Sequence, residues 1–146
     1  MARLGRLVIG AGMLGLALML LGGCGSQKKV SQLSGTVTFK GQPVPAGFIS
    51  FLPDAAKGGM GSMKVAQIKD GKYDTSQSSD PGVVPGPSLI RIAGFDGKVV
   101  PLWGQGKQIF NIYEMRDTVP EGAGTKNFEV PASAANNLKI EPTADR

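Results

Sequence analysis

The side chains that usually carry nucleophilic or metal chemistry are scarce in this sequence. Histidine is absent, and Cys24 is the single cysteine. A Ser-His or Cys-His nucleophile pair is therefore excluded, and the usual ligands of zinc, copper and haem are missing. We expect no cofactor and no metal site. Because one cysteine cannot form an internal disulfide, the sulfur of Cys24 must serve another purpose.

Cys24 lies where an apolar segment ends and a polar one begins. Residues 1–6 contain two arginines and no acidic residue, and residues 7–23 carry no charge. A basic start followed by an apolar stretch is typical of a secretory signal. The uncharged stretch is 17 residues long, just short of the roughly 20 needed to cross a bilayer. A plain membrane helix, or an ordinary signal with an incidental cysteine, is the alternative interpretation.

The residues that end this segment, Leu21-Gly22-Gly23-Cys24, resemble the lipobox of bacterial lipoproteins. The resemblance implies cleavage before Cys24, diacylglycerol on its sulfur, and a further acyl chain such as palmitate on the new amino group. Two or more chains make membrane anchoring stable. Position 25 is Gly and not the Asp that commonly retains lipoproteins at the inner membrane. The resemblance therefore favours the periplasmic face of the outer membrane.

The carboxylates are the remaining candidates for acid and base chemistry. Glycosidases need two carboxyl groups at a set separation, with the pKa of one raised by its surroundings. Asp70, Asp74, Asp80 and Asp96 instead lie near expected turns, where aspartate commonly stabilises the local backbone. The sequence also lacks the spacing of a calcium-binding loop. We expect turn roles for these residues, and a hydrolase that uses carboxylates alone is a remote alternative.

Aromatic residues are the candidates for ligand binding. Trp103 lies in a glycine-flanked stretch beside Gln105 and Lys107, where an exposed indole could stack on a sugar ring. The alternative is that Trp103 closes one end of the core. Tyr113 is a second candidate for ligand binding. Tyr73, in an expected hairpin, is predicted to lie in the core.

Short strands must position all of these residues. Alternating apolar and polar residues at 33–40 are typical of a half-buried strand. Asp70-Gly71 is a strong hairpin signal, because both residues tolerate positive φ. In the next strand, Ile49 and Phe51 are expected to point inward. The full set of expected strands is 33–40, 48–52, 63–69, 72–75, 88–95, 109–113, 126–130 and 138–140.

This pattern predicts an all-β fold. Past the signal, no stretch keeps a helical period, so the fold class is an antiparallel Greek-key β-sandwich of about seven strands, after an N-terminal signal helix. The domain boundaries follow: a signal peptide at 1–23, the lipidated Cys24 with a polar tether at 24–32, the β-sandwich at 33–142 and a tail at 143–146.

A family resemblance supports this fold. The segments that carry it occur in order as Gly35-Thr36-Val37, Gly41-Gln42-Pro43-Val44, Gly47-Phe48-Ile49-Ser50-Phe51, Asp70-Gly71-Lys72-Tyr73, Val84-Pro85-Gly86 and Leu89-Ile90-Arg91-Ile92. Together they resemble the carboxypeptidase regulatory-like domain, a transthyretin-like sandwich. Small bacterial lipoproteins with one such domain are also similar, including a closing segment like Phe128 to Ala132. Relatives of this kind serve as accessory, adhesive or glycan-associated modules. Some transthyretin-like proteins are hydroxyisourate hydrolases, but this chain lacks their histidines and their C-terminal motif.

The charge of the chain excludes one class of partner. Without residues 1–23, 14 basic residues remain against 11 acidic ones, a net charge of +3. They are spread along the chain and form no basic cluster, so we expect no nucleic-acid partner. The sequence predicts an exported, lipid-anchored envelope lipoprotein that is not an enzyme and acts as a binding or scaffold module. It would contact the membrane through its acyl chains and bind an envelope protein. The alternative is a carbohydrate- or peptidoglycan-binding module.

Overall fold

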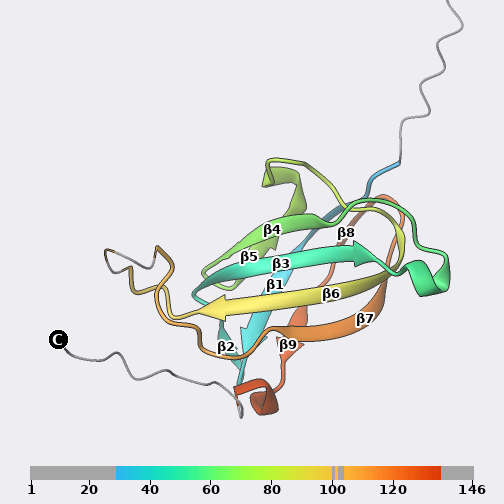
Figure 1. The fold of residues 1–146 in the computed structure, drawn as a ribbon. Helices are drawn as coiled ribbons and strands as arrows, with labels where there is room; N and C mark the ends of the chain where they lie inside the picture. Colours follow the sequence, from blue (N-terminus) through green and yellow to red (C-terminus); the bar gives the residue numbers. More distant parts are fainter. Residues whose placement is uncertain (1–28, 100, 102–103, 136–146) are drawn as a thin grey trace, which may run out of the picture.

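The protein is almost entirely β-structure. The computed structural model describes residues 29–99, 101 and 104–135. The strands are β1 (Gln32–Phe39), β2 (Gln42–Pro43), β3 (Ala46–Pro53), β4 (Lys64–Lys69), β5 (Lys72–Asp74), β6 (Gly86–Phe95), β7 (Tyr113–Val119), β8 (Ala123–Thr125) and β9 (Phe128–Val130). Short 3-10 turns follow at η1 (Ala55–Lys57), η2 (Thr75–Gln77) and η3 (Ala132–Ala135). The expected all-β class is confirmed, and the chain path is shown in Figure 1.

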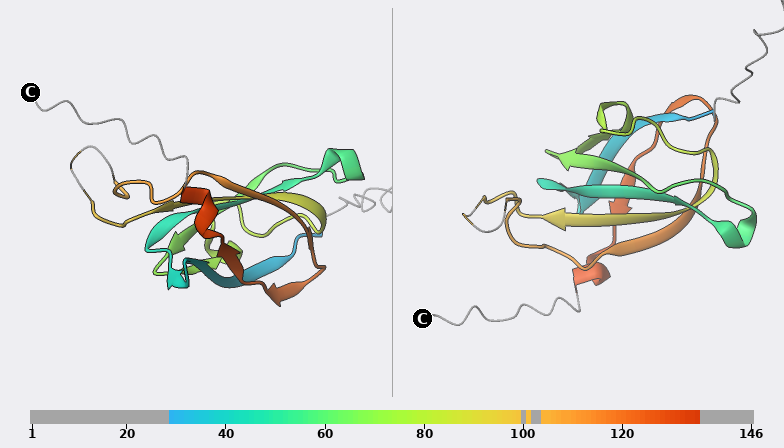
Figure 2. Two further views of the ribbon diagram at one scale, coloured as in Figure 1. Left: turned by 90° about the horizontal axis from the view of Figure 1, so that it is seen from below. Right: turned by 45° about the horizontal axis from the view of Figure 1, so that its top comes forward.

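The strands form one strongly curled sheet. Its order is β2-β1-β5-β4-β3-β6-β7, with β8 and β9 also paired to β1. Figure 2 shows how the curl brings β1 and its partners around one side of β3 and β6. Most pairs are antiparallel, as expected, but β1 runs parallel to both β8 and β9. The expectation of a purely antiparallel arrangement is therefore wrong at this one place.

β8 and β9 behave as one interrupted strand. Leu33 pairs with Gly124 in β8, and Val37 pairs with Phe128 in β9, which is the same register along β1. Between them, the backbone N–H of Lys126 donates to the Ser34 carbonyl at 2.8 Å. A side chain at Gly35 would overlap the carbonyl oxygen of Lys126. Glycine at position 35 therefore permits the close approach of the two strands.

Two tight turns connect neighbouring strands as their sequences predict. Asp70 and Gly71 have φ of 50° and 72°, and Lys40 and Gly41 have φ of 52° and 73°. These left-handed conformations are those required at both central positions of a type I′ hairpin, where glycine is best tolerated. The first turn joins β4 to β5, and the second joins β1 to β2.

The core lies on the concave side of the curled sheet. Period-two alternation places Ile49 and Phe51 inside, as expected, and leaves Phe48 on the outer face. The other fully buried large side chains are Phe110, Leu33, Ile68, Ile90, Ile92, Val37, Val44, Val83, Val119 and Val130. Every buried hydrophobic residue of the described part belongs to the segment from Leu33 to Val130. This segment accordingly supplies the whole described core.

Several expected elements differ from the structure. The strand predicted at 109–113 is wrong, because β7 begins at Tyr113 and runs to Val119. β2 and β8 were not expected at all, since two and three residues are too few to show alternation. The strand predicted at 138–140, the tail at 143–146 and the signal helix lie outside the described residues.

Candidate functional site

Most of the predicted site residues lie outside the part of the chain that the structure describes. These are Leu21, Gly22, Gly23, Cys24 and Trp103. Tyr113 is described: it opens β7, is paired with the buried Ile92 of β6, and packs half-buried against the core. Its ring is therefore turned toward the interior from the edge of the sheet, and its ligand-binding role stays a prediction.

Tyr73 is a core residue, as the sequence predicts. Its side chain is 3% exposed and packs against Phe51 and Phe128, with ring centroids 6.1 and 5.9 Å away. The hydroxyl donates to the Lys126 carbonyl at 2.8 Å, which satisfies the one polar group that the ring carries inward. Burial raises the pKa of the phenol, so the hydroxyl stays neutral and acts as a donor.

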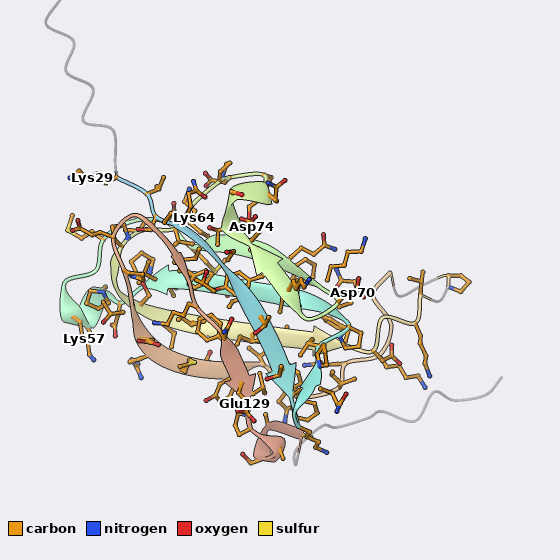
Figure 3. The ribbon with its side chains drawn as sticks, turned by 180° about the vertical axis from the view of Figure 1, so that it is seen from behind. Lys29, Lys57, Lys64, Asp70, Asp74 and Glu129 are labelled. Carbon is orange, nitrogen blue, oxygen red and sulfur yellow. The ribbon has the colours of Figure 1, made fainter. Side chains whose placement is uncertain are left out.

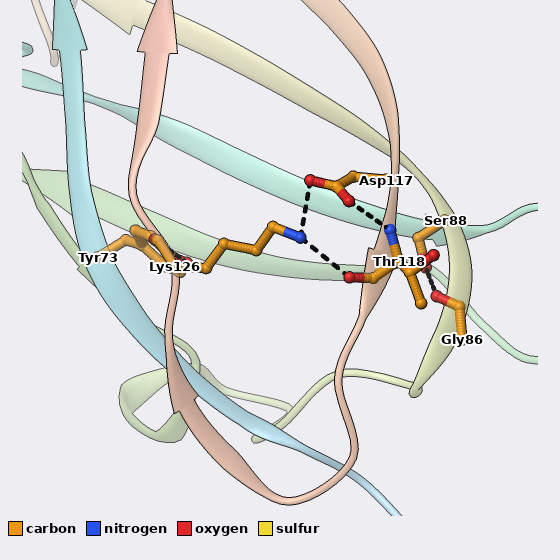
Figure 4. Close-up of polar contacts among 6 residues, drawn as sticks. All are labelled: Tyr73, Gly86, Ser88, Asp117, Thr118 and Lys126. Carbon is orange, nitrogen blue, oxygen red and sulfur yellow. Dashed lines mark hydrogen bonds and ion pairs between the residues drawn. The ribbon is translucent and has the colours of Figure 1, made fainter.

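The side chain of Lys126 connects two edges of the curled sheet. Lys126 lies between β8 and β9, and its ammonium donates to the Thr118 carbonyl of β7 at 2.9 Å. The same ammonium lies 2.7 Å from the carboxylate of Asp117. Figure 4 shows this side chain crossing from one strand to the other. The hydrogen bond from Lys126 is the main cause that holds the pKa of Asp117 below its usual range.

The contacts around Thr118 limit what the β7 edge can do. The Thr118 N–H donates to the Asp117 side chain at 2.7 Å, while its carbonyl accepts from Lys126. Both backbone groups of Thr118 are thus occupied by side chains. Charged side chains of this kind are a common means of blocking strand addition. An added strand would therefore have to pair with β7 before Thr118.

Two partly exposed carboxylates, those of Asp74 and Asp96, have the turn roles that their sequence context predicts. Asp74 accepts from the backbone N–H and hydroxyl of Ser76 at 2.8 and 2.7 Å, and these bonds lower its pKa. Asp96 accepts from the N–H groups of Lys98 and Lys107 at 3.0 and 2.9 Å. The bond from Lys98 is the largest cause of its lowered pKa. Both carboxylates fasten loops, which matches the expectation for aspartate at turns.

An open groove lies on the outer face of the sheet where β3 ends. Its floor includes Leu52 and Leu89, which are cross-strand neighbours in β3 and β6. Arg116 of β7 is the next residue in the same cross-strand row, and the loop that follows η1 contributes Met60. The groove encloses about 640 Å³. It combines an apolar floor with one guanidinium at its rim.

Asp54 connects this groove to the neighbouring loop. One carboxylate oxygen accepts from the Ala56 N–H at 3.2 Å, and the other accepts from Nε of Arg116 at 3.2 Å. The Asp54 side chain is only 9% exposed, whereas that of Arg116 is 64% exposed. Because Arg116 uses Nε for this contact, its terminal amino groups are directed to other partners or to solvent.

The segments around the groove meet at one end of the molecule, which we call the tether end. It comprises residues 29–31, 54–63, 80–87 and 120–122, together with Arg116, which contacts Asp54. A side chain added at Gly82 would meet Val30, and one added at Gly61 would meet Val84, so these three segments lie side by side. Lys29 and Pro85 also line one small cavity. Figure 3 shows Lys29 and Lys57 toward the same end of the sheet.

Sequence reasoning did not identify Asp54, Arg116 or Lys126. Asp54 follows a strand and precedes two alanines, which is a local capping signal that could have been used. Arg116 and Lys126 carry no such signal, because their partners are 62 and 8 residues away in the chain. Their roles depend on strand register.

Within the described residues, no three potential metal-ligating side chains gather in one place. That same part of the chain contains no helix long and apolar enough to cross a membrane. No protein-family model matches the chain, and a comparison with curated proteins finds no match either.

Proposed function

We propose that this protein is an exported lipoprotein of the bacterial cell envelope, anchored through acylated Cys24, whose β domain is a non-enzymatic binding or structural module. The observation that carries the proposal is the separation between the Cys24 motif and the fold. All buried hydrophobic residues of the described part lie at Leu33 or later, so the described hydrophobic core does not include the motif at Leu21 to Cys24. The preferred location is the periplasmic face of the outer membrane.

The finer features of the fold belong to the same proposal. We propose that the curled sheet is a Greek-key β-sandwich of the transthyretin-like, carboxypeptidase regulatory-like kind. The Gly41 and Asp70-Gly71 turns, together with the strand β6 that begins at Gly86, support this assignment, because they fall where that pattern has its turns and its next strand. The parallel β1–β9 pair uses the Phe128 segment that the resemblance includes.

A protein partner is the favoured ligand class. β7 is paired on one edge only among the described strands, and the residues before Thr118 leave that edge available. The glycan- or peptidoglycan-binding alternative rests on Trp103, and retention on purified peptidoglycan that Trp103→Ala abolishes would favour it. A carboxylate-only hydrolase has little support, because Asp54, Asp74, Asp96 and Asp117 are each engaged in turns or ion pairs.

Lipid attachment tests the proposal directly. The full chain and its Cys24→Ala variant would be expressed in a bacterial host supplied with an alkyne-tagged palmitate. We expect the wild type to incorporate the tag and to enter the detergent phase on Triton X-114 partition. The variant should remain unlabelled and retain its first 23 residues, because cleavage follows lipidation in this pathway. An unlabelled wild type, or a variant labelled to the same extent, would contradict the proposal.

A further inference from the structure

We propose that the tether end lies against the lipid surface that carries the anchor, with Met60 in the interface and Arg116 and Lys57 at the headgroup phosphates. The inference rests on the proposed acylation of Cys24 and adds an orientation to it. The occupant of this end would be an anionic phospholipid surface. The remainder of the sheet, including β7, would face away from the membrane or along it.

The length of the tether brings this end to the membrane. Five peptide steps separate Cys24 from Lys29, and they span about 17 Å at full extension. Lys29 lines a cavity with Pro85 and Glu121, so it belongs to the tether end and not to a distant tail. A domain held this closely by its end residue must keep that end within a few side-chain lengths of the lipid headgroups.

The exposed side chains at this end suit a membrane interface. Met60 is 82% exposed, the largest exposure among the described large hydrophobic residues, and Met63 and Val30 are also exposed. Lys57 closes η1 three residues before Met60, and Lys29 precedes Val30. Apolar side chains bordered by lysine and arginine are typical of surfaces that enter the headgroup region. The cations then bind anionic phosphates.

Most acidic groups of the tether end are already neutralised. Asp54 is paired with Arg116, and Asp80 is paired with Lys64. Glu121 has no ion pair among the described residues and opposes binding to an anionic surface. Lys29 and Lys57, which have no ion pair in the described part of the chain, outnumber it. The balance at this end therefore favours negatively charged lipid.

The groove offers a place for one lipid headgroup. Arg116 lines this groove together with Leu52, Leu89 and Met60. Because the Asp54 contact uses Nε, the terminal amino groups of Arg116 can donate to a phosphate without breaking that pair. The apolar floor then contacts the first carbons of an acyl chain. This arrangement matches a charged head joined to an apolar tail.

The opposite end supplies a matched control. Val99 is 72% exposed and lies in the loop after β6, whereas η1 follows β3. β3 and β6 are antiparallel neighbours, so these two loops leave opposite ends of the sheet. At about 3.3 Å per residue, the eight residues of β3 separate the two ends by about 26 Å. A probe at Val99 therefore reports the end that should remain in water.

The test uses the full acylated chain with one introduced thiol. Since acylation consumes the Cys24 sulfur, Met60→Cys and Val99→Cys each carry a single free thiol for an environment-sensitive fluorophore. Both proteins would be reconstituted in phosphatidylglycerol–phosphatidylethanolamine vesicles containing nitroxide-labelled lipid. We expect the Met60 probe to be quenched at least threefold more strongly than the Val99 probe. Equal quenching of the two probes, or an unquenched Met60 probe, would overturn the proposal.

A second experiment tests whether the charges of Lys57 and Arg116 contribute to the contact with anionic lipid. Adding Lys57→Gln and Arg116→Gln to the Met60→Cys chain should reduce quenching of the probe on the anionic vesicles several-fold. Replacing the anionic vesicles by phosphatidylcholine vesicles should reduce the quenching of the unsubstituted Met60→Cys chain by a similar factor. Unchanged quenching in both cases would overturn the assigned roles of Lys57 and Arg116. Circular dichroism would verify that each labelled chain keeps its β-structure.

Mass spectrometry before labelling separates the two levels of the inference. A chain without acyl mass would overturn both the proposed anchoring and the orientation that rests on it. An acylated chain whose Met60 probe is unquenched would overturn the orientation alone. An acylated chain with a quenched Met60 probe and an unquenched Val99 probe supports both.

Discussion

At the scale of single residues, the side chain of Lys126 connects β7 to the segment between β8 and β9. Elsewhere in the sheet, neighbouring strands are connected by backbone hydrogen bonds. Its backbone carbonyl accepts from buried Tyr73, and its ammonium reaches Thr118 and Asp117 on β7. The side chain is 22% exposed, so its contacts are partly shielded from water. One residue thereby joins the first-strand region to the last long strand.

We expect Lys126→Met to lower the free energy of unfolding by about 1 kcal/mol. The substitution keeps most of the aliphatic stem and removes one hydrogen bond and one partly exposed ion pair, each of modest net value. Urea denaturation followed by circular dichroism would measure the change. Lys72→Met on β5 is the control, because Lys72 is exposed and has no ion pair in the described part of the chain. Equal losses in the two variants would contradict the role of Lys126.

At the scale of elements, the pairing of β1 with β8 and β9 is the feature that completes the fold. These two short strands share one register along β1, and the Lys126 backbone between them approaches β1 so closely that a side chain at Gly35 would overlap the Lys126 carbonyl oxygen. Thr36 then donates to the side chain of Asn127 at 2.9 Å. The last part of the described chain is thus attached to its first strand.

Gly35→Ala should destabilise the protein by more than about 2 kcal/mol, because an added methyl group meets the backbone oxygen of Lys126 and cannot be relieved by a side-chain rotation. Thermal unfolding would show this as a lower midpoint temperature. Gly104→Ala is the matched control, since nothing lies near the position of its added methyl group. A Gly35→Ala protein as stable as Gly104→Ala would disprove the close approach.

At the scale of the whole molecule, three carboxylates make the stability depend on pH. Local hydrogen bonds lower the pKa of Asp74, Asp96 and Asp117 in the folded protein. A carboxyl with a depressed folded pKa contributes stability that is complete above its unfolded pKa, near 3.9, and is lost as pH falls through the folded value. The folded state should therefore weaken below about pH 4.

Urea denaturation between pH 7 and pH 2 would test this expectation. We expect these three carboxylates to leave the free energy of unfolding unchanged near neutral pH and to lower it below about pH 4. Asp117→Asn should reduce the slope in the acid range, because its amide does not titrate. A wild-type profile that stays level to pH 2 would contradict the cited pKa directions.

Two local patterns were sufficient to predict much of the fold. These are the alternation of apolar and polar residues and the turn residues that tolerate positive φ. The period-two pattern identified β1, and the Asp70-Gly71 turn identified β4 and β5 on either side of it. The apolar residues of 48–52 and 88–95 identified β3 and β6. β7 was misplaced because its Glu114, Arg116 and Thr118 make the segment look like a polar loop, while Tyr113, Met115 and Val119 alternate with them. The candidate groove was missed, since its rim and floor come from three strands.

The sequence by itself determined the β class, the inward-facing residues of the longer strands, and the absence of histidine and of any second cysteine, because these depend on composition and local periodicity. Only the tertiary structure decided that β1 pairs in parallel with β8 and β9, that Lys126 reaches β7, and that Arg116 meets Asp54 beside Met60. Such contacts join residues far apart in the chain. They depend on register and sheet curvature, which no local pattern encodes.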